Sequence, residues 1–277
     1  DILAHHETLR LGSPAHLMRL VVLAKQVPDT RQVTGQVMRE DGTLNRAALP
    51  AVYNPDDLYA LEQALRLKAR FGGRVTGVTM GPPAAVRLLQ ESLYRGADEV
   101  ILLSDGRFAG ADTLATSYVL SLAVRRLGVV DLVLCGRQAI DGDTGHTPVQ
   151  VARVLGWPPL TYVAAIQSLD GGSITVDRMT DDGKETVTAK LPVVISFVKE
   201  INEPRYPSFR GIRKASKAVI PNWTAGDIGV SAPAAKADWS NVYPIPPREG
   251  EIEMIAGDTP EEQARNLVNK LFEEKVI

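Results

Sequence analysis

Short apolar runs alternate with segments of helical periodicity over the first half of the chain. Between the runs, apolar residues recur every three or four positions, which places Leu58, Leu61 and Leu65 on one face of a helix. Strands that alternate with helices in this way form a parallel sheet built from crossover units. Strands are expected at residues 19–27, 74–80, 99–103 and 130–135, and helices at about 54–70, 83–95, 113–128 and 147–155.

The period changes to two after Trp157, which indicates an added β segment. Its strands are expected at residues 161–169, 173–179, 185–190 and 193–198. From about Asn202 the regular pattern fades and prolines recur, so an extended arm is predicted. At the far end of this arm, Thr259 precedes a proline and two glutamates, a capping pattern that predicts a final helix at 259–274.

The pattern divides the chain into three parts. Residues 1–17 carry three of the four histidines and no strand or long helix pattern, so an N-terminal extension or cloning remnant before a start at Met18 is expected. Residues 18–201 form the α/β domain, and residues 202–277 form an arm that packs on a partner subunit. A small hairpin is expected between Gly35 and Gly42.

Composition excludes several classes of protein. The net charge of −2 in 277 residues gives no basic surface for nucleic acid. No apolar stretch reaches the roughly 18 residues of a membrane span. The single cysteine, Cys135, excludes an internal disulfide and a cysteine-based metal cluster, and it fits a reducing compartment, the cytoplasm.

Catalytic equipment is sparse. Neither G-x-G-x-x-G nor G-x-x-x-x-G-K-[ST] follows a predicted strand, and no nucleophile elbow is present. His146 is the only histidine after Met18. A hydrolytic triad and a metal site are therefore not expected, and no residue is assigned a catalytic role.

A glycine-rich loop follows the strand that ends at Cys135. Its glycines let backbone N–H groups approach a ligand, and the next helix offers its N-terminus to a phosphate. Arg137 could pair with a phosphate, and Asp141 or Asp143 could hold a ribose hydroxyl; the alternative is an acidic turn that caps a helix. The loop comprises Gly136, Arg137, Gln138, Ala139, Ile140, Asp141, Gly142, Asp143, Thr144, Gly145, His146 and Thr147.

Three further segments are expected at the same edge of the sheet. Thr113 and Thr116 lie three positions apart on the first turn of a helix, so both hydroxyls face the same side and could bind a ligand. The alternative is that this segment has no ligand role and that Asp112 is an ordinary N-cap. Because open α/β sheets bind ligands at the carboxyl ends of their strands, the convergence of these loops predicts a nucleotide site. The other two segments are Asn54–Asp57 and Met80–Pro83.

Several of these motifs, in this order, resemble the beta subunits of electron-transfer flavoproteins from Met18 to the C-terminus. The loop G-R-Q-A-I-D-G-D-T resembles that family's adenine-nucleotide loop. The matching segments are Val22–Asp29, Asn54–Asp57, Gly136–Thr144, Val176–Ser196, Asn202–Tyr206 and Gly211–Ala215.

The resemblance implies a Rossmann-like α/β domain whose C-terminal arm embraces an FAD-carrying alpha subunit. It implies nucleotide contacts at Leu23, at Asn54, Asp56 and Asp57, at Met80 and in the loop 136–147. It also implies that residues 207–217 form a recognition loop for a partner dehydrogenase, with Phe209 where acyl-CoA-linked members have an anchoring leucine. The docking residues carried over are Phe209, Arg210, Arg213 and Lys214.

The family has two classes, and the resemblance favours one of them. Conventional members hold a structural AMP in this subunit and carry electrons from acyl-CoA dehydrogenases. Electron-bifurcating members hold a second FAD, which takes a hydride from NADH and divides its electrons between the alpha-subunit FAD and ferredoxin or flavodoxin. The segments 79–83, 110–117 and 134–144 resemble the bifurcating class, whereas Gly145–Pro148 departs from its usual A-Q-V-G. In that class Thr113 and Thr116 would lie beside the flavin.

Overall fold

The computed structural model describes residues 17–29, 49–170, 172–230, 235–237, 250 and 252–277. The hairpin expected near Gly35 and all but the last residue of the N-terminal extension lie outside these ranges. No helix within them is long and apolar enough to cross a membrane.

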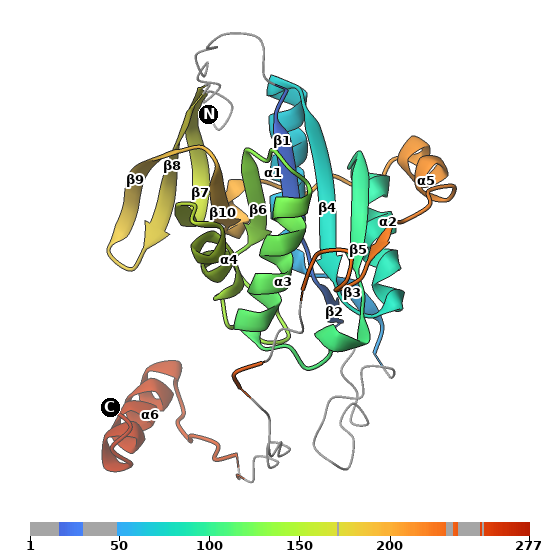
Figure 1. Cartoon of the computed structure of the whole chain (residues 1–277). Coiled ribbons are helices and arrows are strands. Elements are labelled where there is room, and N and C mark those ends of the chain that lie inside the picture. Colours follow the sequence, from blue (N-terminus) through green and yellow to red (C-terminus); the bar gives the residue numbers. More distant parts are fainter. Residues whose placement is uncertain (1–16, 30–48, 171, 231–234, 238–249, 251) are drawn as a thin grey trace.

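A mixed nine-stranded sheet forms the centre of the molecule (Figure 1). Its strand order is β11-β5-β4-β1-β6-β10-β7-β8-β9, and the first seven strands of this order pair in parallel. β8 and β9 continue it antiparallel. In chain order the strands are β1 (Arg19–Leu23), β4 (Arg74–Met80), β5 (Glu99–Leu103), β6 (Leu132–Gly136), β7 (Pro159–Asp170), β8 (Ser173–Thr180), β9 (Gly183–Lys190), β10 (Val193–Phe197) and β11 (Asn222–Trp223). This α/β fold, with a mostly parallel sheet and an added β segment, confirms the predicted class.

Helices cover both faces of the parallel part (Figure 1). Neighbouring strand residues point to opposite faces, so Val22 packs in one apolar cluster and Val21 in the other. The first cluster includes residues of α1 (Pro55–Phe71) and α2 (Val86–Arg95), and the second includes residues of α3 (Thr113–Arg126) and α4 (Thr147–Leu155). The core therefore consists of two apolar layers separated by the sheet.

The first predicted strand was wrong in one respect. Residues 19–27 do not form one strand, because β1 ends at Leu23 and a separate β2 (Gln26–Pro28) pairs antiparallel with β3 (Ala51–Tyr53). The break leaves Lys25 between two strands at the carboxyl edge of the sheet.

The proline-rich segment after Asn202 is more regular than expected. It contains α5 (Phe209–Ala215), which packs on α2, and β11, which joins the main sheet beside β5. Gly211 permits the packing, because a Cβ there would lie 2.1 Å from the carbonyl oxygen of Tyr94. The predicted last helix is present as α6 (Pro260–Glu273), capped by Thr259 and without a buried residue. Short 3₁₀ helices occur at Pro83–Ala85, Gly106–Phe108 and Lys199–Ile201.

Candidate nucleotide-binding site

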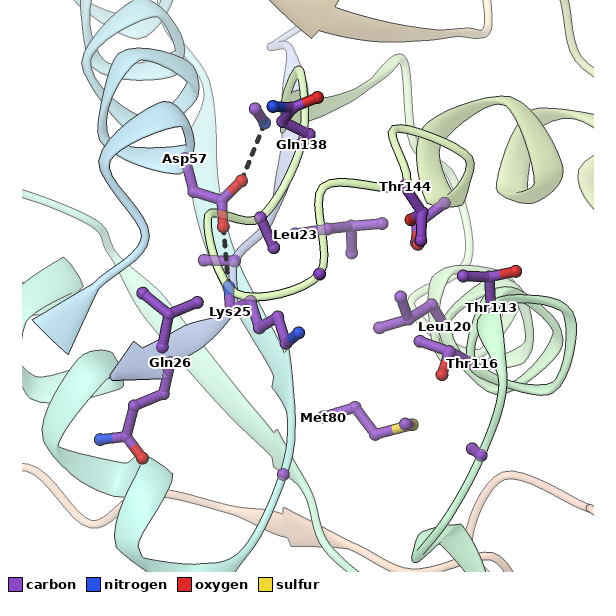
Figure 2. A pocket seen from close by; sticks show the side chains of 18 of the residues that line it. Leu23, Lys25, Gln26, Asp57, Met80, Thr113, Thr116, Leu120, Gln138 and Thr144 are labelled. Carbon is purple, nitrogen blue, oxygen red and sulfur yellow. Dashed lines mark hydrogen bonds between the residues drawn. The ribbon is translucent and has the colours of Figure 1, made fainter. Parts of the chain in front are cut away.

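A cavity of about 800 Å³ lies at the carboxyl ends of β1, β4 and β6. A volume of this size is in the range of cofactor and ligand pockets. Figure 2 shows Leu23 and Lys25 on one side and Thr113, Thr116 and Leu120 on the other. The cavity is therefore bounded by two elements that are about ninety residues apart in sequence: the end of β1 and the start of α3.

Asp57 connects α1 to the ends of two strands through hydrogen bonds at the cavity. It projects from the first turn of α1 and is buried. One carboxylate oxygen accepts the Lys25 N–H at 2.8 Å, and the other accepts the Gly136 N–H at 3.0 Å. Burial raises the pKa of Asp57 to about 7, although both N–H groups stabilise the carboxylate. Asp57 thus joins α1 to the ends of β1 and β6 (Figure 2).

Gly136 is required at the end of β6 by the closeness of α1. A Cβ at this position would lie 2.5 Å from the Asp56 carbonyl carbon and 2.5 Å from Asp57 Oδ1. Any side chain would push the loop away from α1 and from the carboxylate that holds it. The glycine therefore sets where the loop 136–147 begins.

Two polar side chains hold that loop in place. Asn54 Nδ2 donates to the Gln138 carbonyl at 2.8 Å, and Asn54 Oδ1 accepts the Ile140 N–H at 3.2 Å. Lys25 Nζ donates to Asp141 at 2.6 Å. These contacts tie the loop to the segments that follow β1 and precede α1.

Asp56 of α1 and Arg137 of the loop form an ion pair with a longer separation. Arg137 Nε lies 3.5 Å from Asp56 Oδ2 and is buried without a hydrogen-bond partner within the described residues. Burial raises the pKa of Asp56, and the Arg137 charge opposes that shift. Arg137 Nε therefore has an ion-pair partner in Asp56 but makes no hydrogen bond within the described residues.

The start of α3 forms the opposite wall. Asp112 Oδ1 accepts the Ala115 N–H at 2.8 Å, so Asp112 is the N-cap, as the simpler sequence interpretation had it. Its backbone donors lower the pKa of this carboxyl. Thr113 and Thr116 also line the cavity (Figure 2).

The lining contains groups of both charges. Lys25 is the only cation among the described lining residues, which include the carboxylates Asp57, Asp112 and Asp143. The N-termini of α3 and α4 add positive potential. A nucleotide combines anionic phosphates with ribose hydroxyls that donate to carboxylates. The described lining contains no serine or histidine, and its one cysteine, Cys135, is buried.

The structure brings most of the predicted site residues together. Six of the predicted residues do not line the cavity: Asn54, Asp56, Arg137, Ile140 and Asp141 support the loop or lie in its backbone, and His146 is exposed at the start of α4. The predicted residues that line it are Leu23, Asp57, Met80, Asp112, Thr113, Thr116, Gly136, Gln138, Ala139, Gly142, Asp143, Thr144, Gly145 and Thr147.

Sequence reasoning missed several lining residues. Lys25 and Gln26 were assigned to the interior of a strand, and recognising that the strand ends at Leu23 would have placed them at the ligand edge. Phe108, Leu120 and Cys135 carry no polar signal and are typical of core positions.

The predicted docking residues lie on α5, away from the cavity. Phe209 is 94% exposed, so it does not pack against the sheet. Arg210 and Arg213 are also exposed, and Lys214 belongs to the same helix. The helix thus presents an aromatic ring among basic residues, and docking stays a prediction.

Comparison with known proteins finds a family model and several relatives whose names all refer to electron transfer. A family model described as "Electron transfer flavoprotein domain" matches residues 41–228. The caffeyl-CoA reductase-Etf complex subunit CarD of Acetobacterium woodii is 45% identical over 265 residues, covering 94% of this chain and all of that protein. The electron transfer flavoprotein subunit beta of Clostridium acetobutylicum is 42% identical over 268 residues, with the same coverage. The acryloyl-CoA reductase electron transfer subunit gamma of Anaerotignum propionicum is 39% identical over 272 residues, also with that coverage.

The family model spans more than half of the chain, and the relatives align over nearly all of it. The residues matched by the family model include the ends of β4 and β6 and the loop 136–147. The chain therefore belongs to the electron transfer flavoprotein family, among its beta subunits.

Proposed function

We propose that this chain is the beta subunit of an electron-bifurcating electron transfer flavoprotein and that its cavity holds FAD. The observation that supports FAD is the extent of the cavity. It continues from the loop 136–147 to Met80, Thr113 and Thr116 on the far wall. An AMP held by the loop would leave that polar wall without a ligand group, whereas the longer FAD has a second half to place there.

The residues of the cavity fit such a ligand. The inner face of the loop, which begins at the close-packed Gly136, would take the adenosine part. Lys25, the cation of the described lining, would take phosphate charge. Thr113 and Thr116 would hydrogen-bond the ring edge. The FAD would supply the chemistry, accepting a hydride from NADH and passing its electrons separately to the alpha-subunit FAD and to ferredoxin or flavodoxin.

The names of the relatives support an assembly with an alpha subunit and a CoA-ester enzyme. CarD is named as a subunit of a caffeyl-CoA reductase-Etf complex, and the Anaerotignum relative is named as an electron transfer subunit of acryloyl-CoA reductase. In this chain, α6 leaves Leu267, Val268 and Phe272 exposed and has no buried residue, as expected of a helix that packs on another subunit. We assign Phe209 and its basic neighbours to docking of an acyl-CoA dehydrogenase or another flavin dehydrogenase. The cytoplasmic location inferred from the single cysteine stays part of the proposal.

The alternative is a conventional beta subunit with structural AMP. The two assignments differ in nucleotide content, which acid release and chromatography of the purified heterodimer measure directly. Two FAD and no AMP per heterodimer, with reduction by NADH, are expected. One FAD and one AMP would refute the bifurcating assignment.

A paired substitution sharpens this test. The double variant Thr113→Val and Thr116→Val should lower the FAD content of the beta subunit, because only a ligand that reaches α3 uses these hydroxyls. Thr175→Val with Thr188→Val is the matched control, because these two threonines bond each other on β8 and β9, outside the cavity lining. Unchanged nucleotide content in the Thr113 and Thr116 variant would argue for AMP.

A further inference from the structure

One loop forms both a wall of the cavity and a seat for the C-terminal arm. Residues 104–112, here called the wall loop, connect β5 to α3. Phe108, Gly110, Ala111 and Asp112 of this loop line the cavity. A change in the position of the wall loop would therefore change the shape of the nucleotide site.

The arm is attached to the start of the wall loop through Asp105. The Ala225 N–H donates to Asp105 Oδ2 at 3.0 Å, just after β11 pairs with β5. Ile228 and Val230 are buried in the same apolar cluster as Phe108. This part of the arm thus belongs to the same apolar cluster as a residue that lines the cavity.

The arm is attached again at the other end of the wall loop, through Asp112. Its Oδ2 accepts the backbone N–H groups of Lys236 at 2.7 Å and Ala237 at 3.1 Å. Its Oδ1 meanwhile caps α3 through the Ala115 N–H. The Asp112 carboxylate therefore has three roles: it lines the cavity, it caps the helix that carries Thr113 and Thr116, and it binds the backbone of Lys236 and Ala237 in the arm.

We infer that Asp112 is a positioning residue that couples nucleotide binding to attachment of the C-terminal arm. A nucleotide that fixes the wall loop presents Asp112 to the arm, and an attached arm in turn holds the wall loop for the nucleotide. Such coupling is reciprocal, so each event strengthens the other by the same factor. The inference rests on the proposed function only in that the cavity holds a nucleotide, and it is the same for FAD and AMP.

Two variants break this contact from opposite sides, and both are tested in the heterodimer. Asp112→Asn keeps a good N-cap but replaces one acceptor oxygen by an amide that faces two N–H groups. Ala237→Pro removes one of the donors in the arm and leaves the cavity wall untouched. Lys236→Ala is the matched control, because it removes a side chain and keeps the bonded backbone N–H.

The readouts are the rate at which bound nucleotide is released and the hydrogen exchange of a peptide that covers residues 235–237. Both variants should release nucleotide about tenfold faster, the scale of one charge-assisted hydrogen bond, while the control matches the wild type. Removing the nucleotide should speed exchange at 235–237 in the wild type but not in Asp112→Asn. Combining the two variants should add little to either one, since they break the same contact.

Two results would overturn the inference. If Ala237→Pro speeds exchange in the arm and leaves nucleotide release unchanged, the arm and the cavity are independent. If only Asp112→Asn affects release, Asp112 acts as a cap or a direct ligand contact. Because release of either FAD or AMP is scored, a conventional nucleotide content would refute the bifurcating assignment and leave this test intact.

Discussion

Replacing Gly136 by alanine tests the packing on which the cavity depends. The added Cβ would lie 2.5 Å from both the Asp56 carbonyl carbon and Asp57 Oδ1. Rotation of a side chain cannot relieve this clash, because one neighbour is backbone and the other is fixed by the bonds of Asp57 to Lys25 and Gly136. Either α1 or the end of β6 must move.

The expected cost has two parts. Forcing a methyl group into a close-packed site costs about 1–3 kcal/mol. Displacing the Gly136 N–H from the Asp57 carboxylate costs about 1.5–3 kcal/mol more, because the bond is to a charged group in a buried place. Since the two losses share one movement and are not additive, we expect the free energy of unfolding to fall by about 2–4 kcal/mol.

The assay is urea unfolding of Gly136→Ala, together with the nucleotide content of the purified heterodimer. Gly142→Ala is the control from the same loop, because a Cβ at Gly142 meets nothing within 4 Å. The free energy of unfolding of the control should lie within about 0.5 kcal/mol of that of the wild type. If Gly136→Ala unfolds at the same urea concentration as Gly142→Ala and keeps its nucleotide, the close approach of the loop to α1 is not a determinant of the site.

Three further substitutions test charge and exposure. Burial raises the pKa of Asp57 to about 7, above the roughly 3.9 of an unfolded aspartate, so the folded chain binds an extra proton in that window and loses stability as pH rises through it. The urea midpoint of Asp57→Asn minus that of the wild type should therefore increase as the pH is raised from about 5 to about 8. A difference that does not change with pH would contradict the raised pKa of Asp57. Lys25→Met should release nucleotide about tenfold faster and with less salt dependence, whereas Lys25→Arg, which keeps the charge, should retain most of the affinity; equal release by both would exclude a phosphate role. Phe209→Ala should change unfolding by less than about 0.5 kcal/mol but slow electron transfer with the dehydrogenase, and Val129→Ala, an exposed residue outside α5, should not; equal rates would remove Phe209 from the docking surface.

Sequence patterns located the parts of this site that follow from strand ends. The strand ending at Met80 was predicted with its observed bounds, and the helix starting near Thr113 followed from its N-cap. Because carboxyl ends of parallel strands share an edge, loops distant in sequence could be placed together. That argument needs only the direction of each strand, which alternation of strands and helices provides.

Other features depend on contacts that no local pattern records. The break after Leu23 follows from pairing of β2 with β3, whereas the apolar run ends at Ala24 and Val27 resumes it after two polar residues. The use of Asp57 as a brace depends on where two backbone N–H groups arrive from other elements. Regularity in the arm was missed for the same reason, since the short helix α5 is held by packing on α2 rather than by its own sequence.

The position of β10 has a consequence for the order in which the chain folds. β10 lies between β6 and β7 in the sheet, although β7, β8 and β9 precede it in the chain. During synthesis, one edge of β6 therefore stays unpaired until residue 197 has left the ribosome, and a shorter nascent chain exposes it to wrong partners. The same delay applies to the nucleotide loop, because the Arg137 N–H bonds the carbonyl of Phe197 at 3.1 Å. The loop that follows β6 can therefore take its final position only after β10 has been inserted into the sheet.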